Sequence, residues 1–278
     1  MNTGHLTRGP RRARLRGGVP VTETRRLMSA LLTLVFLVFA LAAAAQQPPA
    51  GRGAGRGGPP PAPPTPRAAA PVDLTGYWVS IVTEDWRWRM ITPPKGDYNS
   101  VPLNPEGRRV ADMWDPSKDG SCEAYGAGAI MRMPGRLHIT WENDSTLKVE
   151  TDAGQQTRTL YFDATRTPPA ERTLQGFSLA EFERPPAGRG PAPPLRWATL
   201  RVKTTNLRPA WLRKNGVPYS ENAVVTEFFD RHSEGDAGEW LTVTTTVDDP
   251  KYLAQPFIVS SSFRREPDGS KFKPAPCN

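Results

Sequence analysis

Apolar and polar residues alternate along most of the chain beyond residue 73, with the period of two that indicates β-strands. In Leu137–Glu142, Leu, Ile and Trp alternate with His, Thr and Glu, and the pattern returns in Leu147–Glu150 and Trp197–Thr204. Turn-forming residues such as Asn143–Asp144 separate the segments. The pattern therefore predicts a succession of strands joined by turns.

Strands at short intervals with turns between them are typical of barrels and sandwiches. We predict an all-β fold, an antiparallel β-barrel of roughly 8–10 strands with one short helix, with a β-sandwich as the alternative. The expected strands are 76–83, 137–142, 147–150, 157–163, 176–183, 197–204, 223–230, 239–247 and 256–265. Glu84–Met90 also alternates and is expected to continue the first strand, whereas Asn206–Asn222 is expected to be a long loop.

One segment carries the signals of a helix. Asn104 is a suitable N-cap, Pro105 suits the first helical position and Glu106 places an acid in the first turn. Because Asp115–Pro116 stops the segment, we expect the helix to run to about Trp114.

The apolar run Leu27–Ala45 follows Arg25–Arg26 and ends in alanines, which is the pattern of a secretory signal peptide. We predict that residues 1–45 form this signal and that the protein is exported, to the periplasm or the extracellular space, without stable membrane insertion after cleavage. The alternative is an uncleaved anchor, since about 19 apolar residues can just span a bilayer. Val21 is a candidate for the true start, and the export route, Sec or twin-arginine, stays open.

The basic charge lies ahead of the predicted domain. Residues 46–71 are rich in Pro and Gly and predict a disordered linker, and 72–278 form the barrel domain. Seven arginines and one glutamate give residues 1–45 a charge of +6, three arginines give the linker +3, and the total of +8 leaves −1 for the domain. A near-neutral domain lacks the basic surface that binds phosphate backbones, so we expect no nucleic-acid partner.

The chain has two cysteines, Cys122 and Cys277. Because disulfides persist in exported proteins, we predict that the two pair and tie an early loop to the C-terminal tail. Two unpaired thiols are the alternative.

The sequence contains no motif typical of a metal site or of a catalytic nucleophile. His138 and His232 are the histidines that follow the leader, and no His-x-His, Cys-x-x-Cys or Gly-x-Ser-x-Gly spacing is present. We therefore expect no metal site and no cofactor, and we assign no catalytic residue.

Gly76-Tyr77-Trp78 begins the first expected strand and resembles the Gly-x-Trp motif of lipocalin-like barrels. The resemblance implies that this motif closes one end of an antiparallel barrel and that an arginine of the last strand packs over the tryptophan. Arg264 and Arg265 are the candidates for that arginine, as a cation–π partner of Trp78. The resemblance covers the first and last strands, and the long 84–133 insertion departs from a minimal lipocalin.

A second resemblance covers most of the domain. The segments that carry it are PLNPEGRRVADMWDP at 102–116, PGRLHITWE at 134–142, GVPYSENAVVTEFFDR at 216–231 and DDPKYLAQPF at 248–257. They resemble a family of exported bacterial proteins, which implies a bacterial, exported context and no particular activity.

Six side chains are candidate ligand contacts: Trp86, Trp88, His138, Trp141, Arg201 and Glu227. Tryptophans can line an apolar cavity, and the other three side chains can fix the polar end of a ligand. The plainer interpretation is that the tryptophans are core residues, that His138 faces solvent, and that Glu227 is exposed or pairs with Arg201 across the sheet.

The preferred functional interpretation is an exported, non-catalytic barrel that binds a small, mostly apolar molecule in its interior. One alternative is a hydrolase, dehydratase or isomerase that uses a buried Glu227 with His138 as acid and base. Another is a structural or interaction module of the cell envelope. The sequence leaves the oligomeric state open.

Overall fold

The computed structural model describes residues 62–83, 85–118, 122–183, 198–233 and 235–277. The expected signal peptide, Val21 and linker residues 46–61 lie outside the described residues. Residues 62–71 belong to the compact unit Ala62–Asn278, and the backbone N–H of Arg67 donates to the carbonyl of Asp144 over 2.9 Å. The described part of the predicted linker therefore packs with the domain.

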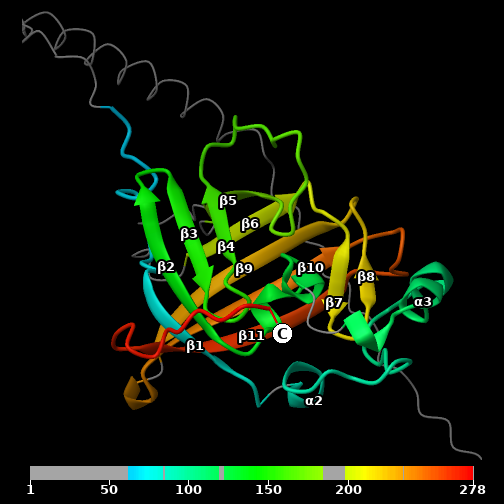
Figure 1. Ribbon diagram of the computed structural model, residues 1–278. Helices are drawn as coiled ribbons and strands as arrows, with labels where there is room; N and C mark the ends of the chain where they lie inside the picture. Colours follow the sequence, from blue (N-terminus) through cyan, green and yellow to red (C-terminus); the bar gives the residue numbers. More distant parts are fainter. Residues whose placement is uncertain (1–61, 84, 119–121, 184–197, 234, 278) are drawn as a thin grey trace, which may run out of the picture. The chain divides into compact units, whose positions relative to one another are not determined.

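Nine strands close into a barrel, which confirms the predicted all-β barrel (Figure 1). The strands are β1 (Gly76–Ile81), β2 (Arg136–Asn143), β3 (Thr146–Thr151), β4 (Thr157–Tyr161), β5 (Phe177–Glu183), β6 (Thr199–Thr205), β9 (Val224–Ser233), β10 (Glu239–Asp248) and β11 (Phe257–Glu266). Around the barrel their order is β1-β11-β10-β9-β6-β5-β4-β3-β2. Every neighbouring pair is antiparallel except β4–β5, which is parallel and differs from the antiparallel expectation.

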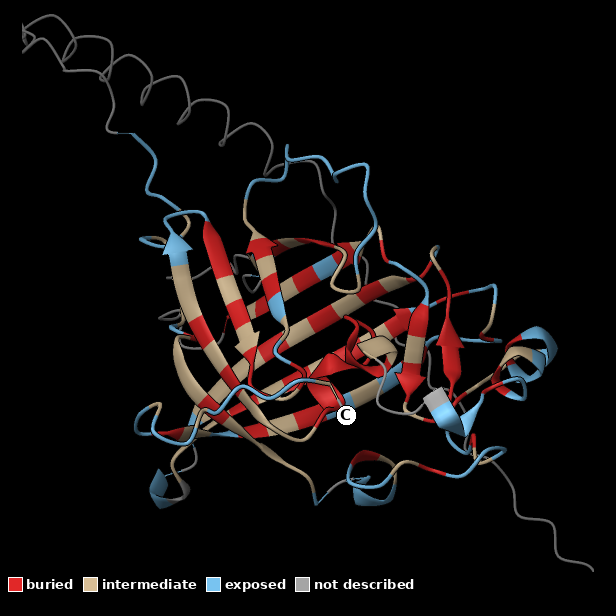
Figure 2. Cartoon of the chain, in the orientation of Figure 1, coloured by how far each residue is buried: buried red, intermediate tan, exposed pale blue. Residues whose placement is uncertain are grey.

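The alternation in the sequence places apolar side chains inside the barrel. Buried residues alternate with half-buried or exposed ones along the strands (Figure 2). Register brings the inward residues opposite one another, so that Ile139 lies across from Val149 and Leu200 lies across from Phe229. These four side chains belong to the buried cluster that fills the barrel.

The segment expected to be a long loop contains a short hairpin, which corrects that prediction. β7 (Ala210–Arg213) pairs with β8 (Val217–Tyr219), and Gly216 makes the turn with φ 77° and an N–H bond to the Arg213 carbonyl. Strands of four and three residues are too short to show a period, and Pro218 breaks the usual strand signal. A second buried cluster, which includes Leu212, Tyr219 and Phe257, joins this hairpin to the barrel.

The expected strand over Glu84–Met90 is wrong for the described residues 85–90, because a short helix, α2 (Trp86–Arg89), lies there. Asp85 has φ 54°, a left-handed conformation that ends an extended strand. The Arg89 side chain then turns back to donate to the carbonyls of Ile81 and Arg132. Tertiary hydrogen bonds thus override the local alternation.

The predicted helix is present as α3 (Pro105–Ala111). The Asn104 side chain accepts from the backbone N–H of Gly107 over 2.8 Å, as an N-cap does. The helix ends at Ala111, with Asp112 as its C-cap, so it is shorter than the expected run to Trp114. Three further turns are 3₁₀ helices η1 (Pro116–Lys118), η2 (Cys122–Tyr125) and η3 (Ile130–Arg132), and a fourth, η4 (Gly235–Ala237), joins β9 to β10.

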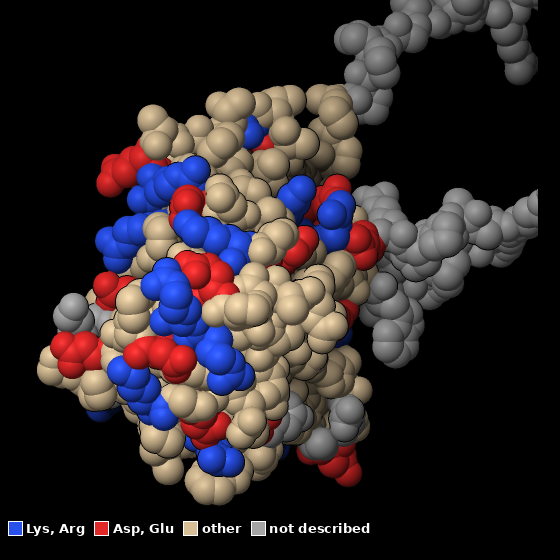
Figure 3. Space-filling view, turned by 90° about the vertical axis from the view of Figure 1, so that its right-hand side faces the viewer, with Lys and Arg blue, Asp and Glu red and all other residues tan. Residues whose placement is uncertain are grey.

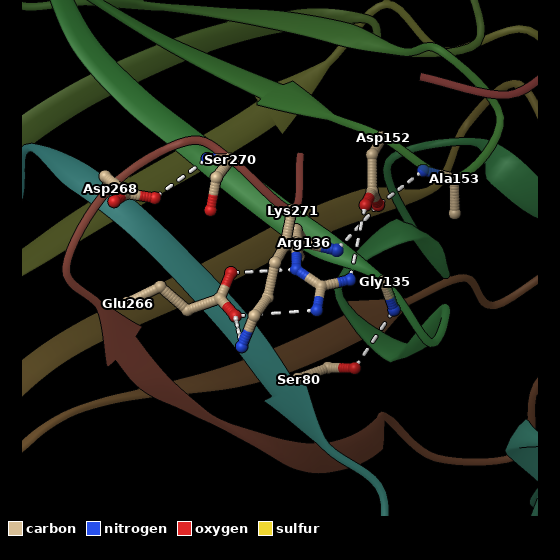
Figure 4. Close-up of polar contacts among 9 residues, drawn as sticks. All are labelled: Ser80, Gly135, Arg136, Asp152, Ala153, Glu266, Asp268, Ser270 and Lys271. Atoms are coloured by element: carbon tan, nitrogen blue, oxygen red, sulfur yellow. Dashed lines mark hydrogen bonds and ion pairs between the residues drawn. The ribbon is translucent and has the colours of Figure 1, made fainter. Parts of the chain in front are cut away.

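The C-terminal tail is fastened to the barrel wall at several points. The predicted disulfide between Cys122 and Cys277 is present, with its Cα atoms 5.3 Å apart. Near the start of the tail, Arg136 Nε lies 2.8 Å from Glu266 Oε2, and Lys271 Nζ lies 3.7 Å from Glu266 Oε1 (Figure 4). The Ala275 N–H donates to the carbonyl of Asp152 over 2.8 Å, close to where the tail ends.

The described residues contain no helix long and apolar enough to cross a membrane. On the face shown in Figure 3, lysines and arginines are interspersed with aspartates and glutamates.

Candidate functional site

A buried ion pair lies on the inner side of the barrel wall. Arg158 of β4 is 1 % exposed and Glu227 of β9 is 0 % exposed. Arg158 Nη1 donates to Glu227 Oε1 over 2.9 Å, and Nη2 donates to Oε2 over 2.5 Å, in a bidentate arrangement. Nη2 also reaches the Thr204 hydroxyl at 3.3 Å, and that hydroxyl bonds Ser178 over 2.8 Å. The two charges therefore pair with each other within the protein, and Arg158 Nε is the buried nitrogen of this guanidinium that bonds no described acceptor.

The pair lies in the barrel interior, where we expected a ligand. Apolar residues surround it, including Leu160, Val202 and Phe229, each at most 1 % exposed. Buried side chains of the core cluster therefore occupy this part of the interior, and we look for a ligand site in the wall.

Glu227 does not meet the partners considered for it in the sequence. Its cross-strand neighbour on β6 is Val202, so Arg201 lies on the opposite, outer face. His138 is also on the outer face, because its neighbours Leu137 and Ile139 are the core residues. A Glu227–His138 acid–base pair would need both side chains in one pocket, and the barrel wall separates them.

His138 has its own surroundings on the outer face. Its ring stacks on Tyr77 with centroids 4.2 Å apart, and its Nδ1 lies 3.1 Å from Glu150 Oε2. Phe272 of the C-terminal tail packs against both rings. The histidine thus helps to seat the tail.

The closure motif places Arg265 over Trp78. The guanidinium carbon lies 5.5 Å from the centre of the fully buried Trp78 ring. Gly76, with φ 119°, leaves the space that this guanidinium uses, because a Cβ there would lie 3.2 Å from Arg265 Nη2. Arg264 pairs with Val79 in the register and points outward, so it is not the residue over the tryptophan.

A cleft opens at the seam between β4 and β5. β5 bonds β6 along its whole length but meets β4 at two positions, Ser178 and Leu179. Beyond Tyr161 the chain leaves β4, and a cavity of about 260 Å³ lies beside the uncovered part of β5. Its lining is Phe162, Ala164, Leu179, Ala180, Glu181, Arg201 and Lys203. We refer to this cavity as the seam cleft.

The seam cleft has an apolar floor and a charged rim. Phe162 continues inward into an aromatic row, with its ring centre 5.1 Å from Trp141 and 5.4 Å from Phe182. On the rim, Arg201 forms ion pairs with Glu181 and Glu183. Lys203 is exposed, and within the described residues it has no ion pair. The rim therefore holds one cation already paired and one open to solvent.

The predicted site residues are dispersed over the domain. Arg201 lines the seam cleft, and Trp141 lies behind Phe162. Trp86, on α2, is 55 % exposed, and the neighbouring Trp88 packs against Arg87 and Arg213. These six candidates thus do not form one site.

Sequence reasoning missed Arg158, Phe162, Arg132 and Arg213. Arg158 had a detectable signal, because it lies two residues before Leu160 and therefore shares its inward face. Phe162 lies two residues after Leu160 and shares the same face, but its place beside an open seam depends on the strand order. Arg132 and Arg213 lie in irregular or short elements, where periodicity gives no burial signal.

Over the described part of the chain, no group of three or more His, Cys, Asp or Glu side chains could hold a metal ion. Comparison with protein-family models, with curated proteins and with solved structures finds no match.

Proposed function

We propose that this domain binds a small molecule with an apolar body and an anionic end, and that the ligand sits in the seam cleft. The observation that carries the proposal is the cleft itself, an opening in the barrel wall lined by apolar side chains next to two cations and one carboxylate, Glu181, which pairs with Arg201. Small-molecule sites have this composition, mostly apolar with a few polar groups that fix orientation.

The apolar part of the cleft supplies the binding energy. Leu179 and Phe162 are half-buried, so both still expose apolar surface that a ligand can cover. Ala180 lies on the inner face of β5, so the cleft extends past the outer surface of the sheet. Each Å² of apolar surface removed from water contributes roughly 25 cal/mol.

The charged rim selects the other end of the ligand. Lys203 offers an ammonium group without a carboxylate partner in the described structure. An anionic group placed there gains a partner, whereas a cationic group meets the unpaired charge of Lys203, because Arg201 already pairs with Glu181 and Glu183. The volume of about 260 Å³ falls just below the usual range for drug-sized ligands, roughly 300–1,000 Å³, so the ligand is small.

Calorimetric titration with octanoate and octanol tests this proposal, because the two share an apolar chain and differ in charge. We expect the protein to bind octanoate more tightly than octanol. Ala164→Trp, which fills the cleft, should abolish binding of both. Lys203→Met should weaken octanoate about fivefold or less, the range of an exposed ion pair, and leave octanol unchanged.

Matched substitutions elsewhere serve as controls. Ala254→Trp and Lys273→Met alter exposed residues that do not line the cleft, and both should bind as the unmodified protein does. Undiminished octanoate binding by a folded Ala164→Trp variant would exclude the seam cleft as the site.

The proposal includes export. The Cys122–Cys277 disulfide is compatible with an oxidising compartment, and the expected signal peptide over 1–45 supports the same location. Of the other interpretations, the enzyme required Glu227 and His138 in one pocket, which the opposite faces of β9 and β2 disfavour. The envelope module stays a prediction.

A further inference from the structure

A second group of buried arginines lies away from the seam cleft, under α2. The segment that contains α2 packs against η3 and the β7–β8 hairpin, and it covers Arg132 of η3 and Arg213 of β7. Arg132 is 4 % exposed and Arg213 is 2 % exposed. With Arg89 of α2, which is 5 % exposed and donates to the Arg132 carbonyl, three cations from separate elements are thus removed from solvent in one region.

The guanidinium groups of Arg132 and Arg213 keep buried N–H donors that bond no acceptor among the described residues. They are Nη1 and Nη2 of Arg132 and Nε and Nη1 of Arg213. The indole Nε1 of Trp88, whose ring centre lies 5.0 Å from the Arg213 guanidinium carbon, is a fifth such donor. A buried donor without an acceptor costs about 1–3 kcal/mol, and more when it is charged.

The neighbouring carboxylates do not balance the positive charge of these arginines. Asp97 already bonds Arg87 over 2.7 Å, and Asp85 lies 3.4 Å from Arg132 Nη2. No carboxylate of the described residues lies within 4.0 Å of the Arg213 guanidinium. Arg213 is therefore a buried cation without an ion-pair partner in the described structure.

Burial lowers the pKa of Arg132, and burial together with the charge of Arg132 lowers the pKa of Arg213 to about 10. Arg213 nevertheless stays protonated at neutral pH, because its pKa remains well above 7. Water molecules could accept from the N–H groups, but water carries no charge to balance two cations. An anion supplies both acceptors and charge.

We propose that Arg132 and Arg213 bind one compact oxyanion, phosphate or sulfate, with the Trp88 indole as an additional donor. The planar fork of each guanidinium matches two oxygens of such an ion. The donor nitrogens are buried, so a free inorganic ion suits the position better than a phosphate ester with a bulky substituent. This inference is independent of the seam cleft.

Equilibrium dialysis of the purified protein against radiolabelled phosphate, at constant ionic strength in chloride, tests the proposal. We expect one phosphate per chain and competition by sulfate. The midpoint of thermal unfolding should rise with phosphate concentration, since a ligand of the folded state stabilises it by mass action. Arg213→Met and Arg132→Met should each weaken phosphate binding about 10- to 100-fold, the range of hydrogen bonds to a charged group.

Three further measurements separate a binding site from a structural role. Arg109→Met, which alters an exposed arginine of α3, should bind phosphate as the unmodified protein does. Arg213→Lys keeps the charge and loses the fork, so it should bind more weakly than the unmodified protein but better than Arg213→Met. In chloride alone, Arg213→Met should unfold at the same or a higher temperature, because it removes an unpaired buried cation.

Two results would overturn the inference. One is the absence of saturable phosphate or sulfate binding by the unmodified protein. The other is phenyl phosphate binding as tightly as phosphate, since that would show an open pocket for an ester and not a site for a compact free ion.

Discussion

Buried arginines in two regions of this domain differ in how far their charges are paired. Arg158, inside the barrel, has a carboxylate, Glu227, that accepts from both of its Nη atoms. Arg132 and Arg213, under α2, have four buried donor nitrogens without a hydrogen bond to a described residue, and one of these, Arg132 Nη2, lies 3.4 Å from Asp85 in their one ion-pair contact to a described carboxylate. Burial alone therefore does not decide the role of an arginine. The barrel interior uses its buried charge for internal structure, whereas the region under α2 leaves charge that a ligand can balance.

The largest loss of stability is expected when Arg158 loses its carboxylate partner and so becomes an unpaired buried cation, as Arg213 is. Glu227→Gln leaves Arg158 buried without a countercharge, and breaking such a pair costs about 3–5 kcal/mol. Urea unfolding should show this loss in the free energy of unfolding. Glu150→Gln, which alters a half-buried carboxylate on the outer face, should cost less than about 1 kcal/mol.

The matched double variant separates an unpaired charge from a lost contact. Arg158→Met with Glu227→Leu removes both charges, and such replacements of a buried pair are often neutral or stabilising by about 1–4 kcal/mol. If the double variant is as unstable as Glu227→Gln, the cost lies in packing or in the Thr204 bond, and the charge comparison fails.

The next largest loss of stability is expected on removing the disulfide, which is a covalent link and not an ionic one. Cys122 and Cys277 are 155 residues apart, for which loop entropy allows at most about 5 kcal/mol, and typical losses are about 2–5 kcal/mol. Cys277→Ser should lower the free energy of unfolding by this amount, and reductant should do the same to the unmodified protein. A Cys122→Ser, Cys277→Ser double variant should not respond to reductant, and a response there would mean that reductant acts elsewhere.

The strands could be predicted from the sequence because each has one buried face. Leu137 and Ile139 alternate with His138, and that period survives in the fold. The seam cleft could not be predicted, because it depends on the parallel pairing of β4 with β5 over two positions. No residue pattern reports that pairing, and of the six candidate ligand contacts Arg201 alone lines the resulting cavity.

The buried arginines also show that a strand pattern in the sequence does not predict a residue's partner. Arg158 could have been placed inside the barrel from its spacing to Leu160, but its partner on β9 depends on strand order. Asp85, whose left-handed conformation ends the first strand early, shows why local alternation failed at Glu84–Met90. Alternation reports which face a side chain takes and not what lies opposite it.

A third environment, between the two buried extremes, belongs to Arg265. Its guanidinium lies over Trp78 and its Nη1 donates to Glu239 Oε2 over 2.9 Å, while about a third of the side chain stays exposed. Arg265→Ala should lower the free energy of unfolding by about 1–2 kcal/mol, since a partly desolvated cation–π contact and an ion pair are lost. Arg264→Ala, on the exposed outer side of the same strand, should change it by less than about 0.5 kcal/mol. Equal losses from the two substitutions would show that the contact of Arg265 with Trp78 does not add to the free energy of unfolding.

The smallest effect is expected at Glu239, where arginine and carboxylate meet near the surface. The hydrogen bond from Arg231, together with the charges of Arg231 and Arg265, lowers the pKa of Glu239 below its ordinary value of 4.5. A carboxyl group with a lowered folded-state pKa stabilises the protein above its ordinary pKa, and this stabilisation is lost as the pH falls through the lowered value. The midpoint of thermal unfolding of the unmodified protein should therefore drop more between pH 6 and pH 3 than that of Glu239→Gln, and added salt should shrink the difference by screening.

The Arg158–Glu227 pair is shielded from solvent, so the stability difference between Glu227→Gln and the unmodified protein should respond much less to salt. An equal salt dependence of Glu239→Gln and Glu227→Gln would remove the distinction between surface and buried arginines.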